Sequence, residues 1–212
     1  MRLRPRPQGD SDGNGDTDRI GALSDGVVAI ALTVLALTLT VPTVGDSPGR
    51  LWAALGENAR EYVTFLFSFW LIAQLWMAHR RVLPHFATIP PAVAWWNFLY
   101  LGAIVVLPST ANLLGSNDDN PVAVTLFAAN LVLSTLGLQM MSVAARRAGV
   151  LTGYDDGSWA RNRARAAILL GVPTLVIAVS WVDASTAEWL FALMFFQEVP
   201  GALVDRARAR RS

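Results

Sequence analysis

The chain contains neither cysteine nor lysine, so all 17 of its basic residues are arginine. Without cysteine it has no disulfide bridge, no thiolate metal ligand and no thiol nucleophile. With only two histidines, a catalytic metal site is poorly supported. Charged residues make up 16% of the chain, below the roughly 25% of soluble domains. A net charge of +1 gives no electrostatic basis for nucleic-acid binding.

Hydrophobic residues, in contrast, make up 53% of the 212 residues, and the mean hydropathy is +0.40. They fall into six apolar runs, over residues 19–41, 62–78, 92–115, 122–145, 166–182 and 189–204. About 20 helical residues at about 1.5 Å each cover a bilayer core of roughly 30 Å. The first run lacks a clear small-residue cleavage site, so we interpret it as a retained span. The sequence predicts an all-α membrane protein with six transmembrane helices.

The flanks of these runs alternate in charge. Arginines lie in the N-terminal tail, after the second run, between the fourth and fifth runs, and in the C-terminal tail; they are Arg2, Arg4, Arg6, Arg80, Arg81, Arg146, Arg147, Arg161, Arg163, Arg165, Arg206, Arg208, Arg210 and Arg211. The other three loops are acidic or nearly neutral. Because basic loops stay in the cytoplasm, both termini are predicted to be cytoplasmic.

This pattern divides the chain into three parts. Residues 1–18 are rich in Pro, Gly, Asp and Arg, so we expect a disordered cytoplasmic tail. Residues 19–205 form the membrane domain, whose first helix Thr17 or Asp18 can cap. Residues 206–212 form a basic cytoplasmic tail.

Six polar residues are predicted to lie at one depth, near the cytoplasmic ends of the first three helices. They are Arg19, Ser24, Asp25, Trp76, His79 and Asn97. A carboxylate in the membrane costs about 2.5–3.5 kcal/mol, so Asp25 needs a partner. Arg19 is six positions away and cannot pair with it on one helix face. We interpret the set as a structural polar network; the alternative is that Arg19 and His79 simply contact lipid headgroups.

The outer part of the first helix carries an aliphatic stripe. Ile30, Val34, Leu37 and Val41 follow the spacing i, i+4, i+7 and i+11, and Thr33 borders them. If copies met at an axis, these side chains would form an apolar constriction that can gate by dewetting. The threonine hydroxyls beside it could coordinate a partly dehydrated cation. The alternative is the ordinary aliphatic surface of a transmembrane helix.

Two further features bear on function. Glu198 is a second carboxylate in an apolar run. Three roles are open for it: an ion pair with an arginine, a position at the membrane interface, or a proton relay. Residues 152–154, Thr-Gly-Tyr, resemble the TVGYG filter of ordinary potassium channels. They precede two aspartates in a cytoplasmic loop without a re-entrant helix, so we predict a turn. No catalytic pair supports an enzyme.

Three motifs carry a resemblance to a known family. Arg19-Ile-Gly-Ala-Leu23-Ser24-Asp25 resembles the pattern R-x-x-x-F-S-D, with Leu23 in place of phenylalanine. The residues from Trp76 to Arg80 resemble W-x-x-H-R, and Asn97 with Leu107-Pro108 resembles that family's third helix. The chain is therefore similar to prokaryotic members of the lysosomal potassium channel family, the transmembrane protein 175 family.

The resemblance implies a homotetramer in the plasma membrane, with helix one lining a central pore. It places the narrowest apolar ring at Ile30, with Val34 and Leu37 beyond it, and the selectivity hydroxyl at Thr33. It assigns the six polar residues to the supporting network. Family members can carry serine where this chain has Ala29, which implies weak selectivity.

The expected function is therefore a potassium-permeable channel that passes other monovalent cations. It needs no cofactor and no metal beyond permeating potassium, and its partners are its own copies, the bilayer and these cations. The alternative is a proton-coupled secondary transporter of a small ion or solute that uses Asp25 or Glu198. Such a transporter needs internal repeats or broken helices at mid-membrane, for which Pro108 and Pro173 are the only hints.

Overall fold

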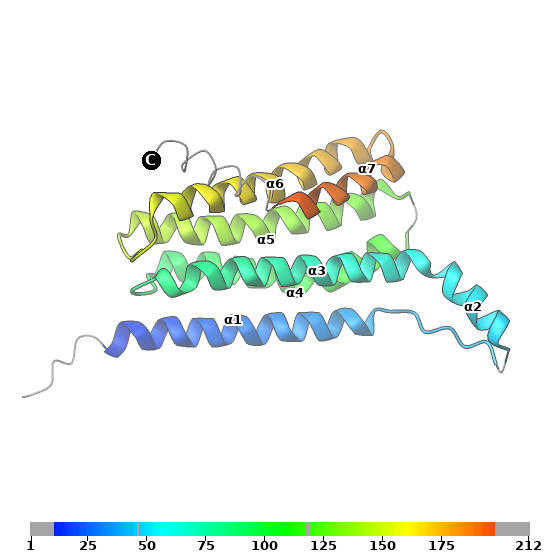
Figure 1. The fold of residues 1–212 in the computed structure, drawn as a ribbon, viewed down its shortest axis with the longest axis horizontal. Coiled ribbons are helices and arrows are strands. Elements are labelled where there is room, and N and C mark those ends of the chain that lie inside the picture. The colour runs from blue at the N-terminus through cyan, green and yellow to red at the C-terminus, as the bar shows by residue number, and fades with distance from the viewer. Residues whose placement is uncertain (1–10, 46, 118, 198–212) are drawn as a thin grey trace, which may run out of the picture.

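A computed structural model describes residues 11–45, 47–117 and 119–197, and this part of the chain is helical throughout apart from its connections (Figure 1). The helices are α1 (Ser11–Leu37), α2 (Pro48–Glu57), α3 (Ala59–Val82), α4 (Pro91–Gly115), α5 (Pro121–Arg147), α6 (Asp156–Ser180) and α7 (Ala184–Leu190), with 3₁₀ helices η1 (Leu83–His85) and η2 (Phe191–Phe196). The predicted all-α class is confirmed.

Five of the described helices, α1, α3, α4, α5 and α6, are long and apolar enough to cross a membrane. They correspond to the first five apolar runs of the sequence. The sixth run, 189–204, begins at the end of α7 and continues through η2. Its remainder, including Glu198, lies outside the described residues.

Two helices begin earlier than the sequence predicted. α1 starts at Ser11, so residues 11–18, which we expected to be disordered, are helical. Thr17 is therefore not a cap; its buried hydroxyl donates to the backbone oxygen of Phe86 at 3.3 Å, which holds this end of α1 against the α3–α4 connection. α6 starts at Asp156 because the Asp155 carboxylate caps it, accepting from the Ser158 backbone N–H at 2.8 Å.

The helices are arranged with α1 at one edge of the bundle, α3 and α4 beside it, α5 next, and α6 with α7 at the opposite edge (Figure 1). α4 and α5 form the centre, where Ile104, Leu107, Phe127 and Leu131 are almost fully buried. Gly137 lets these two helices approach closely, because a Cβ atom there would lie 2.8 Å from the backbone nitrogen of Tyr100. Small residues have this role in membrane helix packing.

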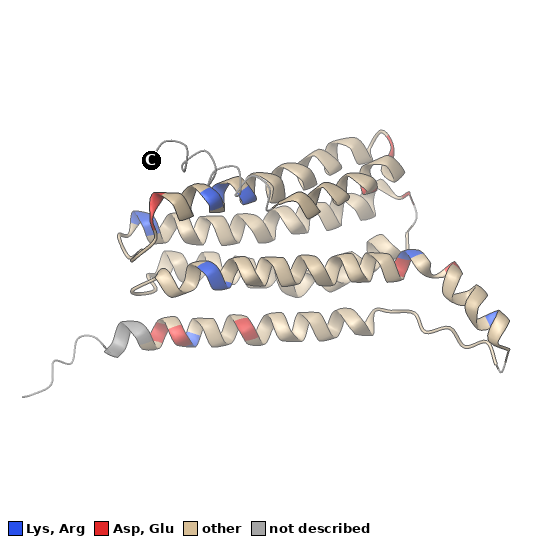
Figure 2. Ribbon diagram, in the orientation of Figure 1, with Lys and Arg blue, Asp and Glu red and all other residues tan. Residues whose placement is uncertain are grey.

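Charged residues gather toward the two ends of the bundle (Figure 2). The end that holds the start of α1 also holds Arg80 and Arg81 of α3 and the arginines of α5 and α6. At the other end, the Arg60 guanidinium of α3 pairs with Glu188 of α7. The middle of the bundle is left to apolar side chains and to a small set of polar groups.

Candidate functional site

One face of α1 packs against α3 and α4. It consists of Ser24, Val28, Ala31 and Leu35, which are 0%, 3%, 3% and 1% exposed. Their spacing of i, i+4, i+7 and i+11 places them on one side of the helix. Along this face α1 is fixed to the rest of the chain.

Another face of α1 is apolar but uncovered. Ile30 is 65% exposed, Val34 41% and Leu37 83%. Val41, the last residue of the predicted stripe, lies beyond Leu37, where α1 ends, so the helix is shorter than the apolar run predicted. Thr33 lies beside them and donates its hydroxyl proton to the backbone oxygen of Ile30 at 2.7 Å, which leaves the lone pairs of the hydroxyl oxygen available. The structure thus leaves Ile30, Thr33, Val34 and Leu37 exposed on one side of α1, with Val34 the most covered of the three aliphatic residues.

A buried cluster of polar groups joins α1, α3 and α4 at their arginine-rich end. The Asn97 side-chain oxygen lies 2.8 Å from His79 Nε2 and 3.5 Å from the Ser24 hydroxyl oxygen, and its amide nitrogen lies 3.3 Å from that hydroxyl. The Ser24 hydroxyl also reaches the backbone oxygen of Ile20 at 2.8 Å. All three side chains are at most 1% exposed, so their polar atoms must find partners within the protein.

Asp25 extends this cluster on the more exposed side of α1. The Trp76 indole N–H donates to the Asp25 carboxylate at 2.7 Å, and the Arg80 guanidinium lies 5.0 Å from the Trp76 ring centre. This contact gives Asp25 the partner that its position in an apolar helix requires. α1 is therefore joined to α3 by two adjacent polar contacts, one direct and one through Asn97.

Arg19 is the predicted member that the structure does not bring into the cluster. Its side chain is exposed and makes no hydrogen bond or ion pair within the described residues. It borders an open surface hollow together with Asp16, Ile89 and Ala94. The predicted network therefore assembles from Ser24, Asp25, Trp76, His79 and Asn97, with Arg19 outside it.

Sequence reasoning missed Tyr100, which packs against the cluster. Its ring stacks on the His79 imidazole, with centres 5.2 Å apart and planes at 7°. Tyr100 lies three positions after Asn97, on the same face of α4, so helical spacing was the signal that could have found it. No group of three His, Asp or Glu side chains that could hold a metal ion occurs in the described part of the chain.

Comparison with known proteins gives a consistent set of relatives. The family described as endosomal/lysosomal potassium channel TMEM175 matches residues 19–108, from α1 to the middle of α4. A Streptomyces collinus protein named a potassium channel is 33% identical over 198 residues, which cover 87% of this chain and 94% of that protein. The Bos taurus endosomal/lysosomal proton channel TMEM175 is 33% identical over 98 residues, which cover 43% of this chain and 20% of that protein.

A solved structure extends the likeness to the fold. The crystal structure of a lysosomal potassium-selective channel TMEM175 homolog from Chamaesiphon minutus superimposes with a TM-score of 0.71 at 25% identity. The match covers 88% of this chain and 98% of that one. The likeness therefore includes α5 and α6, which the family match does not reach.

Proposed function

The chain belongs to the TMEM175 family of potassium channels, and on this premise we propose that it is a weakly selective, potassium-permeable channel. In the proposed assembly, homotetramers place α1 of each subunit around a central pore. The observation that carries the proposal is the uncovered apolar face of α1, with Ile30 and Leu37 65% and 83% exposed. Such a face on a helix at the edge of the bundle needs a partner outside the protomer or lipid.

The proposed constriction consists of rings of Ile30, Val34 and Leu37. A ring of aliphatic side chains offers no ligand to water or ions, so a narrow ring dewets and closes the path. Thr33 is proposed as the selectivity hydroxyl, because its oxygen is exposed beside the Ile30 ring and keeps lone pairs free. Hydration and ring width would then decide conduction, without a loop filter.

The cluster of Ser24, Asp25, Trp76, His79 and Asn97 is proposed as the anchor of the pore helix. A helix that faces a pore lacks packing on that side, so its position has to be set from the other side. The buried hydrogen bonds among Ser24, His79 and Asn97 do this, because each broken bond leaves an unsatisfied polar atom, at a cost of about 1–3 kcal/mol. Arg19 is proposed to act at the channel entrance rather than in this anchor, since it is exposed.

We further propose that the chain crosses the membrane six times and that both termini lie in the cytoplasm. The membrane is proposed to be the plasma membrane. Arginines of α3, α5 and α6 lie at the same end of the bundle as the start of α1 (Figure 2), which supports this orientation through the positive-inside rule. The sixth span would be 189–204, beginning in α7.

The experiment that tests the proposal is potassium flux into liposomes that hold the purified protein, with the oligomeric mass measured in parallel. We expect passive flux that does not saturate at low millimolar potassium, from a protein of four subunits. A proton-sensitive dye in the same vesicles reports proton permeation. This measurement is included because the bovine relative is named a proton channel. Saturable uptake that requires a proton gradient would instead favour the coupled transporter, and a monomer without flux would contradict the channel.

A further inference from the structure

A small pocket lies where α1 ends, between the beginning of α3 and the last turn of α4. Its volume is about 10 Å³, close to the space that one water molecule fills. Leu35 of the packed face of α1 lines it, so the pocket lies on the side of α1 that faces its own protomer. It has room for a single water or a single dehydrated ion, but not for an ion with its hydration shell.

A carboxylate oxygen at this pocket is buried without a hydrogen-bond donor. Glu61 of α3 lines the pocket. Its Oε2 atom is almost inaccessible to solvent and makes no hydrogen bond within the described residues. A carboxylate oxygen that is removed from water without a donor or a counter-ion is costly. Glu61 therefore needs a positive group at this place.

The position of Glu61 in the fold suits a negative charge. It lies in the first turn of α3, the end of a helix at which an acidic side chain is favoured. Gly115 of α4 packs closely against it, because a Cβ atom on Gly115 would lie 3.4 Å from the Cα atom and 3.7 Å from the Cγ atom of Glu61. This packing limits where the side chain can move, so the carboxylate is held beside the pocket.

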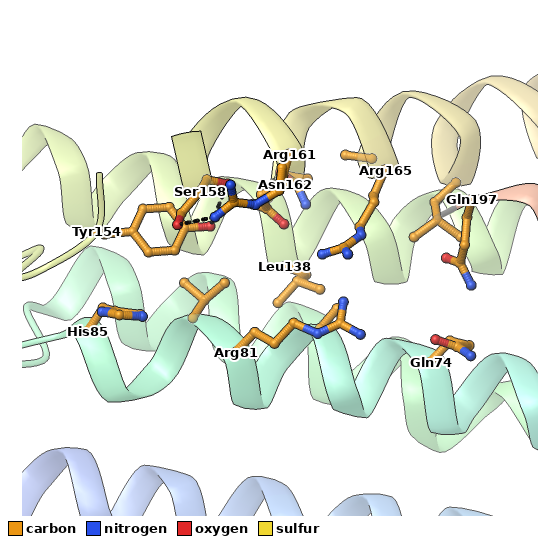
Figure 3. Close-up of a pocket in the computed structure, with 15 residues that line it drawn as sticks. Gln74, Arg81, His85, Leu138, Tyr154, Ser158, Arg161, Asn162, Arg165 and Gln197 are labelled. Atoms are coloured by element: carbon orange, nitrogen blue, oxygen red, sulfur yellow. Dashed lines mark hydrogen bonds between the residues drawn. The ribbon is translucent and has the colours of Figure 1, made fainter. Parts of the chain in front are cut away.

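The neighbouring basic residue is engaged elsewhere. The Arg60 guanidinium pairs with Glu188 of α7 and donates to the backbone oxygen of Leu114 at 3.4 Å. Among the described residues, no Arg or His lines the pocket. The larger pocket at the opposite end of the bundle, between α3, α5 and α6, has the reverse character, since several arginines line it (Figure 3).

The end of α1 adds oxygen atoms to the same pocket. Thr38 lines it just beyond the last residue of α1. Its hydroxyl donates to the backbone oxygen of Leu35 at 2.7 Å, which leaves the lone pairs of the hydroxyl oxygen available. The last carbonyls of a helix also carry a partial negative charge. Asn112 borders the pocket as well, at an exposed position. The pocket thus combines a carboxylate with neutral oxygen atoms, which suits a cation.

Size and charge select the class of cation. One carboxylate among neutral oxygens balances a single positive charge. Ca²⁺ takes about 6–8 oxygen ligands, and Mg²⁺ gives up its waters reluctantly, so neither suits so small a pocket. No group of three His, Asp or Glu side chains in the described residues could hold a metal ion, which agrees with a monovalent ion. A dehydrated potassium ion is close to a water molecule in size, and oxygen ligands can replace its hydration shell.

We propose that this pocket binds one monovalent cation of the size of potassium, held by the Glu61 carboxylate and the Thr38 hydroxyl. The bound ion joins the end of α1 to α3 and α4. The site is separate from the exposed face of α1, and it does not depend on ion transport.

Anomalous scattering locates the ion directly. Crystals of the whole protein are grown with thallium(I) nitrate, because thallium(I) substitutes for potassium. We expect an anomalous peak between Glu61 and Thr38 in the unchanged protein and none there in Glu61→Gln, which keeps the side-chain shape and removes the charge. The matched control is Glu57→Gln, which removes the same charge from an exposed position four residues earlier and should keep the peak. No peak beside Glu61 in the unchanged protein, or the same peak in Glu61→Gln, overturns the proposal.

Thermal unfolding measures the same binding without crystals. Protein in phosphatidylcholine nanodiscs is heated while potassium chloride replaces N-methylglucamine chloride, whose cation is too large for the pocket, at constant ionic strength. An ion that binds only the folded state raises the Tm, by roughly 5 °C at about 100 times its Kd. The unchanged protein and Glu57→Gln should show this rise, and Glu61→Gln should lose most of it. An equal rise in Glu61→Gln contradicts the site.

Thr38→Val guards against misfolding, because it keeps the carboxylate and the side-chain shape. Loss of one neutral ligand should weaken potassium binding roughly threefold, and unaltered affinity would contradict the proposed pair of ligands. The site and the proposed channel can also fail separately. An anomalous peak found only beside Ile30 and Thr33 would support the channel and overturn this site, whereas a peak at Glu61 in a protein without flux would do the opposite.

Discussion

The two faces of α1 are built from similar aliphatic residues but have opposite surroundings. On one, Leu35 is 1% exposed against α3 and α4; on the other, Leu37, two positions later, is 83% exposed. The first face is explained by packing within the protomer, and the second is not. The difference separates residues that hold α1 against α3 and α4 from residues that remain available for contacts outside the protomer. A substitution on one face can therefore be compared with a similar substitution elsewhere.

The largest expected effect comes from making the uncovered face polar. Ile30→Asn places an amide in the proposed constriction, where it would hold water. Removing about 1.4 kcal/mol from a dewetting barrier raises flux about tenfold, so potassium flux in liposomes should rise by that order while discrimination between potassium and sodium falls. The control Val63→Asn changes an exposed aliphatic residue of α3 and should leave flux unchanged. Equal flux from Ile30→Asn and the unchanged protein would count against the constriction.

Shortening the two leucines tests the difference between the faces in terms of stability. Leu35→Ala should lower the unfolding free energy by about 2–5 kcal/mol, because it leaves a cavity between packed helices. Leu37→Ala leaves no cavity within the protomer and should cost much less. Unfolding in mixed micelles followed by circular dichroism measures both. Similar losses of unfolding free energy for the two variants would contradict the distinction between a packed and an exposed face.

Breaking the polar cluster tests what holds the packed face in register. Asn97→Ala removes the group that joins His79 to Ser24 and should lower the unfolding free energy by about 1–3 kcal/mol, since both partners stay buried without it. Asn112→Ala, at an exposed position of the same helix, serves as the control. The idea of an anchor fails if the two variants unfold alike.

The smallest expected effect concerns the hydroxyl next to the constriction. Thr33→Ala removes one proposed ion ligand from each subunit and should reduce the potassium-to-sodium flux ratio roughly threefold. Thr174→Ala removes a similar exposed hydroxyl, bonded to the backbone oxygen of Leu170 at 2.7 Å, from α6 and should not change the ratio. A ratio that is the same in both variants would remove Thr33 from the selectivity assignment.

Hydropathy predicted six spans, of which five are described as helices long and apolar enough to cross a membrane. Helical spacing predicted the aliphatic stripe of α1, but not the packed face of Val28, Ala31 and Leu35. Hydropathy works here because a membrane span must be long and apolar. The depth argument also grouped these polar residues, since topology fixes which helix ends meet, but it left His79, Trp76 and Asn97 open as partners of Asp25. The structure gives Trp76 as that partner. It could not place Arg19, because depth does not say which way a side chain points.

The start of α6 was beyond the same reasoning. The polar stretch 148–165 was interpreted as a connection, because its arginines gave it no apolar run. The overlooked signal was Asp155 as an N-cap, followed by polar residues that recur on one helix face, at Ser158, Arg161 and Arg165. In the Thr-Gly-Tyr segment, the Tyr154 ring packs edge-on against the His85 ring, with centres 5.0 Å apart.

The absence of cysteine makes the central claim directly testable, because single cysteines can be introduced without any background reaction. Leu37→Cys and Leu35→Cys variants are reconstituted in liposomes, treated with a water-soluble cationic thiol reagent, and assayed for potassium flux. If α1 lines a water-filled pore, the reagent modifies position 37 and blocks flux, while position 35 stays unmodified. A lipid-facing position 37 would not react with such a reagent, and unchanged flux with no labelling at that position would contradict the account.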